Sequence, residues 1–124
     1  MIVGDVKPNL DTLITLAVAG PTNRKVEVEA VIDTGFTDYL TLGRDTVTHL
    51  GLRFRESMVY ELVNNEFEML DLYECRVLWD GHWRRVLASA AEGGSLVGMG
   101  LMKGFHLGID IVDGGRVELR RLPR

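Results

Sequence analysis

The sequence predicts an all-β domain with one short helix. Apolar and polar residues alternate over most of the chain, which is the pattern of half-buried antiparallel strands. Turn signals such as Asn64-Asn65 and Asp80-Gly81 separate these runs. Only residues 44–50 look helical, and Gly51 follows them at the position where helices commonly end. Together these features favour a fold built from short strands and tight hairpins.

The first half of the chain is expected to form three strands and the helix. Ile14, Leu16 and Val18 alternate with smaller or polar residues, so residues 12–18 are read as a strand. A turn cluster follows at residues 20–23. In the next strand the apolar side chains at even positions face one way and Lys25, Glu27 and Glu29 face the other, up to Ile32. A short strand at 39–42 then precedes the helix.

The second half is expected to consist of hairpins. Residues 59–63 and 67–72 flank Asn64-Asn65, and asparagine tolerates the positive φ values of a tight turn. Asp80-Gly81 joins a strand at 73–79 to a returning strand at 83–90. A short apolar segment at 96–98 follows a glycine break, and strands at 105–112 and 116–122 form a last hairpin around Asp113-Gly114-Gly115.

Composition indicates one domain, residues 1–124, without a membrane-spanning helix. No apolar run approaches the ~20 residues that cross a bilayer, and the first ten residues lack the apolar core of a signal peptide. The net charge of -4 argues against nucleic acid as the main partner. The single cysteine, Cys75, excludes an internal disulfide and suits a reducing compartment, so we expect a cytoplasmic protein.

The tripeptide Asp33-Thr34-Gly35 is the main candidate functional motif. It directly follows the apolar end of a predicted strand, so the Asp33 carboxylate is expected on a rigid turn at a surface cleft. The alternative is an Asx-type turn, in which the aspartate bonds to backbone N–H groups and glycine supplies positive φ. Such a short motif is weak evidence by itself, so the choice between a functional aspartate and a simple turn depends on the rest of the chain.

Other chemistries have less support. The three histidines (His49, His82 and His106) are scattered, so neither a metal site nor a cofactor is expected. Cys75 shares its strand face with Val77 and Trp79, which predicts a buried, unreactive thiol. Asp38 is read as a surface charge of the loop, with a position at the border of a substrate cleft as the alternative.

Four segments give the tripeptide its context: Asp33-Thr34-Gly35 with its flanks from Val31 to Leu42, Trp79-Asp80-Gly81, Leu96-Val97-Gly98-Met99 and Val112-Asp113-Gly114-Gly115. With them the chain resembles the retropepsin-like aspartic proteases (clan AA), and a prokaryotic single-domain branch in particular. The resemblance implies a retropepsin-like closed β-barrel or sandwich with an active site on the two-fold axis of a homodimer. It also implies that Asp33 is the catalytic aspartate. Because the motif occurs once, the second aspartate would come from a second copy of the chain.

The resemblance also implies roles for other residues. Thr34 would tie the two active-site loops together, Gly35 would let the backbone approach the substrate, and Leu96, Val97 and Gly98 would pack behind the aspartate loop. If Asn64-Asn65 is the tip of the substrate-binding flap, Val63, Asn64 and Asn65 form it. The dimer is expected to use the terminal segments 2–6 and 116–124. If the strand in 116–124 is terminal, one of its edges has no hydrogen-bonded neighbour, and strands of the second copy would cover that edge.

Two departures from the family pattern bear on these expectations. Phe36 and Met99-Gly100 replace residues typical of the retroviral branch, which affects the expected dimer contacts and not the aspartate. The expected flap contains no glycine. The resulting hypothesis is an aspartic endopeptidase in which two Asp33 carboxylates activate a water against a protein or peptide substrate. The alternatives are a catalytically silent relative that serves as a dimerisation or peptide-binding module, and an unrelated small β-barrel with a chance Asp-Thr-Gly.

Overall fold

The computed structural model describes residues 1–124 as ten strands and two short helices. The strands are β1 (Ile2–Val6), β2 (Thr12–Ala19), β3 (Lys25–Ile32), β4 (Leu40–Gly43), β5 (Arg53–Glu61), β6 (Phe67–Trp79), β7 (His82–Ala91), β8 (Ser95–Val97), β9 (Phe105–Ile109) and β10 (Arg116–Arg121). The helices are α1 (Arg44–Leu50) and α2 (Met99–Met102). The all-β prediction is confirmed, and α2 is an addition that the sequence did not reveal.

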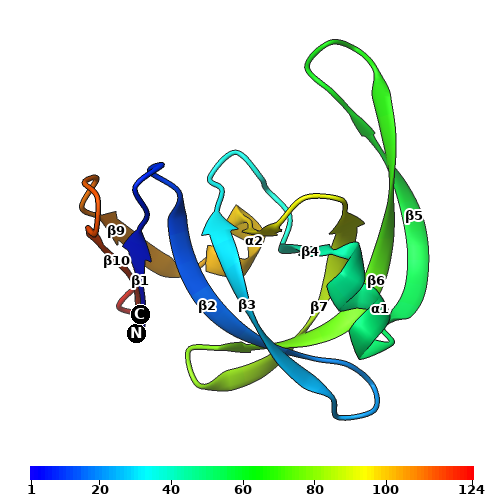
Figure 1. The fold of residues 1–124 in the computed structure, drawn as a ribbon, viewed down its shortest axis with the longest axis horizontal. Helices are drawn as coiled ribbons and strands as arrows, with labels where there is room; N and C mark the ends of the chain where they lie inside the picture. Colours follow the sequence, from blue (N-terminus) through cyan, green and yellow to red (C-terminus); the bar gives the residue numbers. More distant parts are fainter.

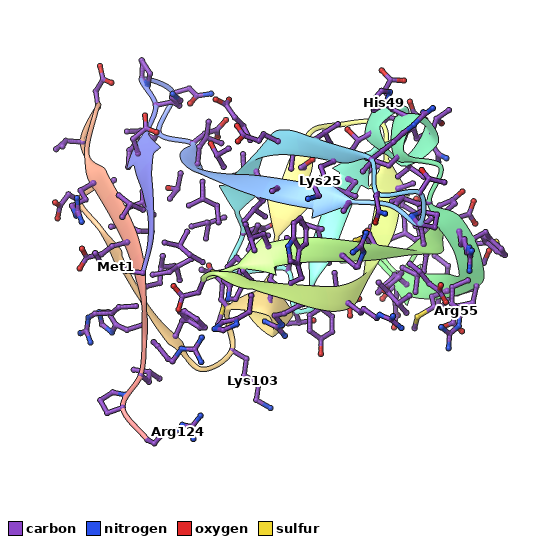
Figure 2. All side chains as sticks on the ribbon, turned by 90° about the horizontal axis from the view of Figure 1, so that it is seen from below. Met1, Lys25, His49, Arg55, Lys103 and Arg124 are labelled. Carbon is purple, nitrogen blue, oxygen red and sulfur yellow. The ribbon has the colours of Figure 1, made fainter.

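Six of the strands close into a barrel. The sheet order is β5-β6-β7-β4-β8-β3-β2-β1-β10-β9, and a further pairing between β6 and β2 closes the ring. The hairpin of β5 and β6 rises from one side of this barrel, and β1, β9 and β10 lie at the other side (Figure 1). Met1 and Arg55, at opposite ends of the molecule in Figure 2, mark these two extensions.

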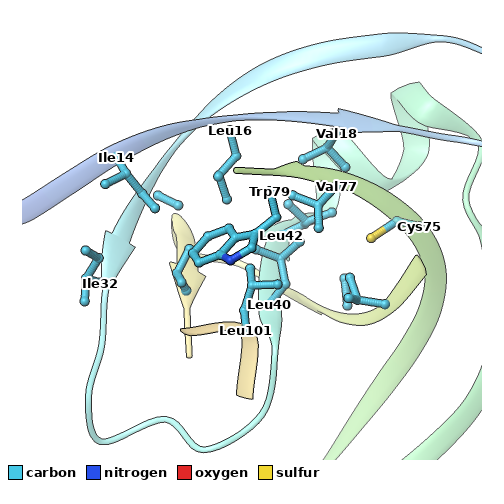
Figure 3. Close-up of a cluster of buried hydrophobic side chains, with 14 of the residues drawn as sticks. Ile14, Leu16, Val18, Ile32, Leu40, Leu42, Cys75, Val77, Trp79 and Leu101 are labelled. Atoms are coloured by element: carbon cyan, nitrogen blue, oxygen red, sulfur yellow. The ribbon is translucent and has the colours of Figure 1, made fainter. Parts of the chain in front are cut away.

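The barrel interior is filled by apolar side chains from the predicted inward faces. Trp79 is its largest fully buried member and lies among Leu16, Leu40, Val77 and Leu101 (Figure 3). Its ring also meets Phe105 edge to face, with the ring centroids 5.7 Å apart. Each of these side chains gains ~1.5–3 kcal/mol from leaving water, so the closed barrel is the main source of stability.

The turns have the conformations that their sequences predicted. Asp80 and Gly81 adopt φ values of 49° and 82°, as a tight β6–β7 hairpin requires. Gly51 ends α1 with φ 61°, and its N–H bonds to the carbonyls of Thr48 and Val47. Asn65 has φ 64° in the β5–β6 turn. Local turn chemistry therefore sets the boundaries of these elements.

β6 is one long strand where the sequence indicated two runs. It has 13 residues, and its first part pairs with β5 while its second part pairs with β7. The register between β5 and β6 shifts at Phe54/Glu56, where a bulge bends the pair. The projecting hairpin is thus a direct continuation of the barrel wall.

The terminal hairpin forms as predicted, but its free edge lies elsewhere. β10 pairs with β1 on one side and with β9 on the other, so the unpaired edge expected for residues 116–124 is wrong. Val117 and Leu119 of β10 are fully buried. The strand at the edge of the sheet is β9. β10 is therefore part of the core and contributes to the stability of the fold itself.

Cys75 lies inside the barrel wall, as its strand face predicted. Burial raises the pKa of its thiol to about 12, so the reactive thiolate is absent near neutral pH. No helix of the structure has the length and apolarity that a membrane crossing would need.

Candidate active site

Asp33 stands at the end of β3 on a turn that its own side chain braces. Its N–H donates to the carbonyl of Val97 at 2.9 Å, which continues the β3–β8 ladder by one residue. The Gly35 N–H donates to Asp33 Oδ1 at 2.9 Å, and the Phe36 N–H donates to the Asp33 carbonyl at 3.2 Å. These bonds fix the backbone and one carboxyl oxygen. Oδ2 remains for another partner.

The turn has the Asx geometry that the alternative interpretation expected, but without positive φ at Gly35. A Cβ at Gly35 would lie 3.3 Å from Asp33 Oδ1, a tight contact with the oxygen to which the Gly35 N–H donates. Thr34 is exposed at the turn, and Asp33 is half-buried. The motif therefore lies at the surface, with Asp33 partly covered and Thr34 open to solvent.

Leu96, Val97 and Gly98 lie directly beside this turn. Val97 of β8 pairs in parallel with Ile32 of β3 and antiparallel with Leu40 of β4. The Gly98 N–H donates to the carbonyl of Tyr39 at 3.0 Å. A Cβ at Gly98 would overlap the Asp38 carbonyl oxygen, so only glycine fits. β8 thus joins the chain segments before and after the Asp33 turn.

α2 supports the second half of the same loop through hydrogen bonds from its first two residues. The Met99 N–H donates to the Phe36 carbonyl at 2.7 Å, and the Gly100 N–H donates to the Asp38 carbonyl at 3.0 Å. The first N–H groups of a helix have no partner within the helix, and here loop carbonyls satisfy them. In the sequence, Met99-Gly100 stood out only as a departure from a family pattern, so this support was missed.

The predicted flap residues form the tip of the projecting hairpin. Val63, Asn64 and Asn65 lie in the turn between β5 and β6, far out from the barrel (Figure 1). The Asn64 side chain accepts a hydrogen bond from the Glu66 N–H at 3.1 Å, and the Asn65 N–H donates to the Leu62 carbonyl at 3.0 Å. These local bonds form the tip without glycine.

A contact between the hairpin and the Asp33 loop was not foreseen. The Tyr60 hydroxyl on β5 donates to Asp38 Oδ2 at 2.5 Å. The half-buried Asp38 is therefore not a free surface charge, and it lines the cavity described below. The sequence holds no signal for this pair, because 22 residues separate its members.

The hydrogen bond between Tyr60 and Asp38 depends on pH. The hydrogen bond to Asp38, with partial burial and the charges of Asp38 and Glu56, raises the pKa of Tyr60 to about 12. A raised pKa means that folding favours the neutral hydroxyl. The contact is fully present below the ordinary tyrosine pKa near ~10, and it is lost as the pH rises towards the folded value.

Replacing Tyr60→Phe should loosen the hairpin. The variant keeps the ring and loses the hydrogen bond to a carboxylate, so we expect amide hydrogen exchange in residues 62–66 to accelerate by roughly tenfold. Tyr73→Phe is the matched control, because Tyr73 lies on β6 and packs against Phe54 through its ring. Equal exchange at the tip in both variants would show that the Tyr60–Asp38 contact does not hold the hairpin.

A cavity of about 830 Å³ extends along β6 and β7, from the chain that leaves the Asp33 turn to the turn between β2 and β3. Asp38, Tyr39 and Leu40 form one side of it, and Met58 and Leu72 of the hairpin form another. Neither Asp33 nor the three residues of the tip line it. No three His, Cys, Asp or Glu side chains gather into a group that could hold a metal ion.

Comparison with known proteins agrees with this architecture. No family model matches the chain, and no curated protein matches it. The chain is similar to the crystal structure of a retropepsin-like aspartic protease from Rickettsia conorii, with a TM-score of 0.60 and 17% sequence identity. The match covers 98% of this chain and 91% of that chain. At this identity the similarity establishes a retropepsin-like fold.

Proposed function

We propose that this chain is a single-domain aspartic endopeptidase that is active as a homodimer. The observation that supports it most is the Asp33 turn: a braced, surface-presented Asp-Thr-Gly at the end of β3, within a fold that covers nearly the whole chain of a retropepsin-like protease. Asp33 is the proposed catalytic residue. Thr34, Gly35, Leu96, Val97 and Gly98 position it.

Two copies are needed because the reaction requires a carboxylate base and a carboxylic acid at the same time, and a single Asp33 cannot be both. In a dimer with both Asp33 turns on the two-fold axis, the carboxylates lie close enough to share one proton. The ionised member takes a proton from a bound water, which attacks the scissile carbonyl. The protonated member donates to the oxygen on which charge develops.

The other residues have supporting roles in this mechanism. Thr34 is exposed at the turn, which suits a hydrogen bond to the loop of a second copy. The tip at Val63, Asn64 and Asn65 would close over an extended peptide, exclude water and offer backbone hydrogen bonds. The hairpin is joined to the Asp33 loop through Tyr60 and Asp38, so closure and alignment of the loop are linked.

Hydrolysis of a mixed peptide library across pH tests the proposal. The rate should pass through a single optimum on the acidic side of neutrality, because only the singly protonated pair is active. Chelators should leave the rate unchanged. At low protein concentration the specific activity should fall with dilution, because the dimer dissociates.

Two results would argue against this mechanism. A rate that is flat from acid to alkaline pH would contradict a shared proton, and specific activity that is independent of dilution down to fully monomeric protein would contradict the dimeric site. Peptide binding without hydrolysis at any pH would instead indicate a silent peptide-binding module.

A further inference from the structure

We infer that the cavity between the hairpin and the Asp33 loop is a subsite for an acidic side chain of the substrate peptide. This inference rests on the proposed function, since it names the kind of side chain that a substrate of the Asp33 site would carry into the neighbouring cavity. The cavity has the volume of typical ligand pockets, ~300–1,000 Å³. Asp38 and Tyr39 of its wall follow Asp33 by five and six residues, so a side chain of a peptide held at the Asp33 turn would reach the cavity along this loop.

The wall of the cavity is strongly basic although the chain is acidic. Five arginines and only two carboxylates line it, whereas the whole chain has a net charge of -4. The arginines are Arg53, Arg55, Arg76, Arg84 and Arg85, and the carboxylates are Asp38 and Glu74. The basic wall is therefore a local feature, because basic residues are not in excess in the protein as a whole.

Both carboxylates of the wall already have partners. Glu74 accepts a hydrogen bond from Arg55 at 2.8 Å, and Asp38 accepts one from the Tyr60 hydroxyl at 2.5 Å. The pair of Arg55 and Glu74 is neutral overall. None of the other four arginines forms an ion pair, so the wall keeps an excess of positive charge over the single unpaired charge of Asp38.

Two of the arginines face each other on neighbouring strands. Arg76 of β6 is directly opposite Arg85 of β7. Like charges in this position repel and destabilise a sheet. The Arg76 guanidinium is directed to the Gly20 carbonyl at 3.0 Å and to Asn23 Oδ1 at 3.3 Å, and neither of these partners is a carboxylate. An anion bound beside the pair would relieve the repulsion.

Arg53 and Arg85 are the groups best able to meet such an anion. Both are exposed, and neither takes part in an ion pair of the structure. Apolar members of the wall, Met58, Leu72 and Leu87, can contact the methylene groups of a glutamate side chain. A guanidinium fits a carboxylate through two parallel hydrogen bonds, so the wall suits Glu or Asp better than a neutral amide.

Binding to the Asp33→Asn protein tests the subsite without hydrolysis. The probes are pairs of blocked peptides that differ only in Glu or Gln at one position, which is moved along the peptide. At neutral pH, where glutamate is ionised, one position should bind about tenfold more tightly with Glu than with Gln. Added salt should reduce this preference.

Arginine variants connect the preference to the cavity. In the Asp33→Asn background, Arg53→Gln and Arg85→Gln should each weaken the preference for Glu, and the double variant should remove it. Arg120→Gln is the matched control, because Arg120 is also exposed but lies on β10 and does not line the cavity. This control should keep the full preference.

The outcomes separate this inference from the proposed function. Equal binding of Glu and Gln peptides at every position, no binding of either, or a preference that survives in the double variant would overturn the subsite. If the native protein still hydrolyses peptides in those cases, the proposed function stands. Tight, arginine-dependent binding of Glu peptides by the Asp33→Asn protein, with no hydrolysis of any peptide by the native protein, would support the subsite and contradict the endopeptidase.

Discussion

The Asp33→Asn chain should fold normally and lose at least ~10³-fold in the rate of peptide hydrolysis. Asparagine has nearly the same shape, and its side-chain oxygen can still accept the hydrogen bond from the Gly35 N–H. It cannot take part in the proposed shared-proton step, so each site of the proposed dimer would lose its acid and its base. Rates at the acidic optimum, together with thermal unfolding of both proteins, measure the effect.

A control variant and an experiment that mixes native and variant chains test this prediction further. Asp45→Asn removes an exposed carboxylate from the first turn of α1 and should leave the rate unchanged. An excess of Asp33→Asn chain mixed with native chain should suppress the native activity, because mixed dimers contain one aspartate per site. Undiminished activity in the mixture, despite exchange of subunits, would place a complete site within one chain.

Gly98→Ala should disrupt the site and destabilise the fold. The new Cβ would overlap the Asp38 carbonyl oxygen and lie 2.7 Å from Phe36 Cδ2, so the loop that follows Asp33 must move. This movement breaks the hydrogen bonds from Met99 and Gly100 to the same loop. We expect a loss of about 3 kcal/mol in the free energy of unfolding and a large loss of activity.

Gly94→Ala is the matched control for this substitution. Gly94 lies four positions earlier, and a Cβ there would have no atom within 4 Å. Unfolding in denaturant should therefore distinguish the two alanine variants clearly. Equal stability of both variants would mean that the loop after Asp33 can move at no cost in stability. Gly98 would then not hold the Asp33 turn in place.

The strands and turns could be predicted because their signals are local. The alternation in β3, the helix before Gly51 and the hairpin at Asp80-Gly81 each depend on neighbouring residues, and the structure has them all. The position of Asp33 at the end of β3 followed from the same alternation. Its role in catalysis came from the family resemblance and remains a proposal.

The features that were missed depend on contacts between distant parts of the chain. The position of β10 between β1 and β9 is set by strand pairing across the whole chain, so its edge could not be assigned from its own sequence. The contact of Tyr60 with Asp38 and the support of the Asp33 loop by α2 likewise join separate segments. Composition did not reveal the basic cavity either, because its arginines come from three different strands.

The arrangement of the two Asp33 side chains in a crystal of the dimer tests the central claim most directly. The measurement is the distance between the nearest carboxyl oxygens of Asp33 in one protomer and Asp33 in its partner. The account predicts about 3 Å, with both turns on the two-fold axis and the two hairpins over the same cleft. A hydrolytically active protein whose Asp33 carboxylates face separate clefts, far beyond hydrogen-bond distance, would contradict it.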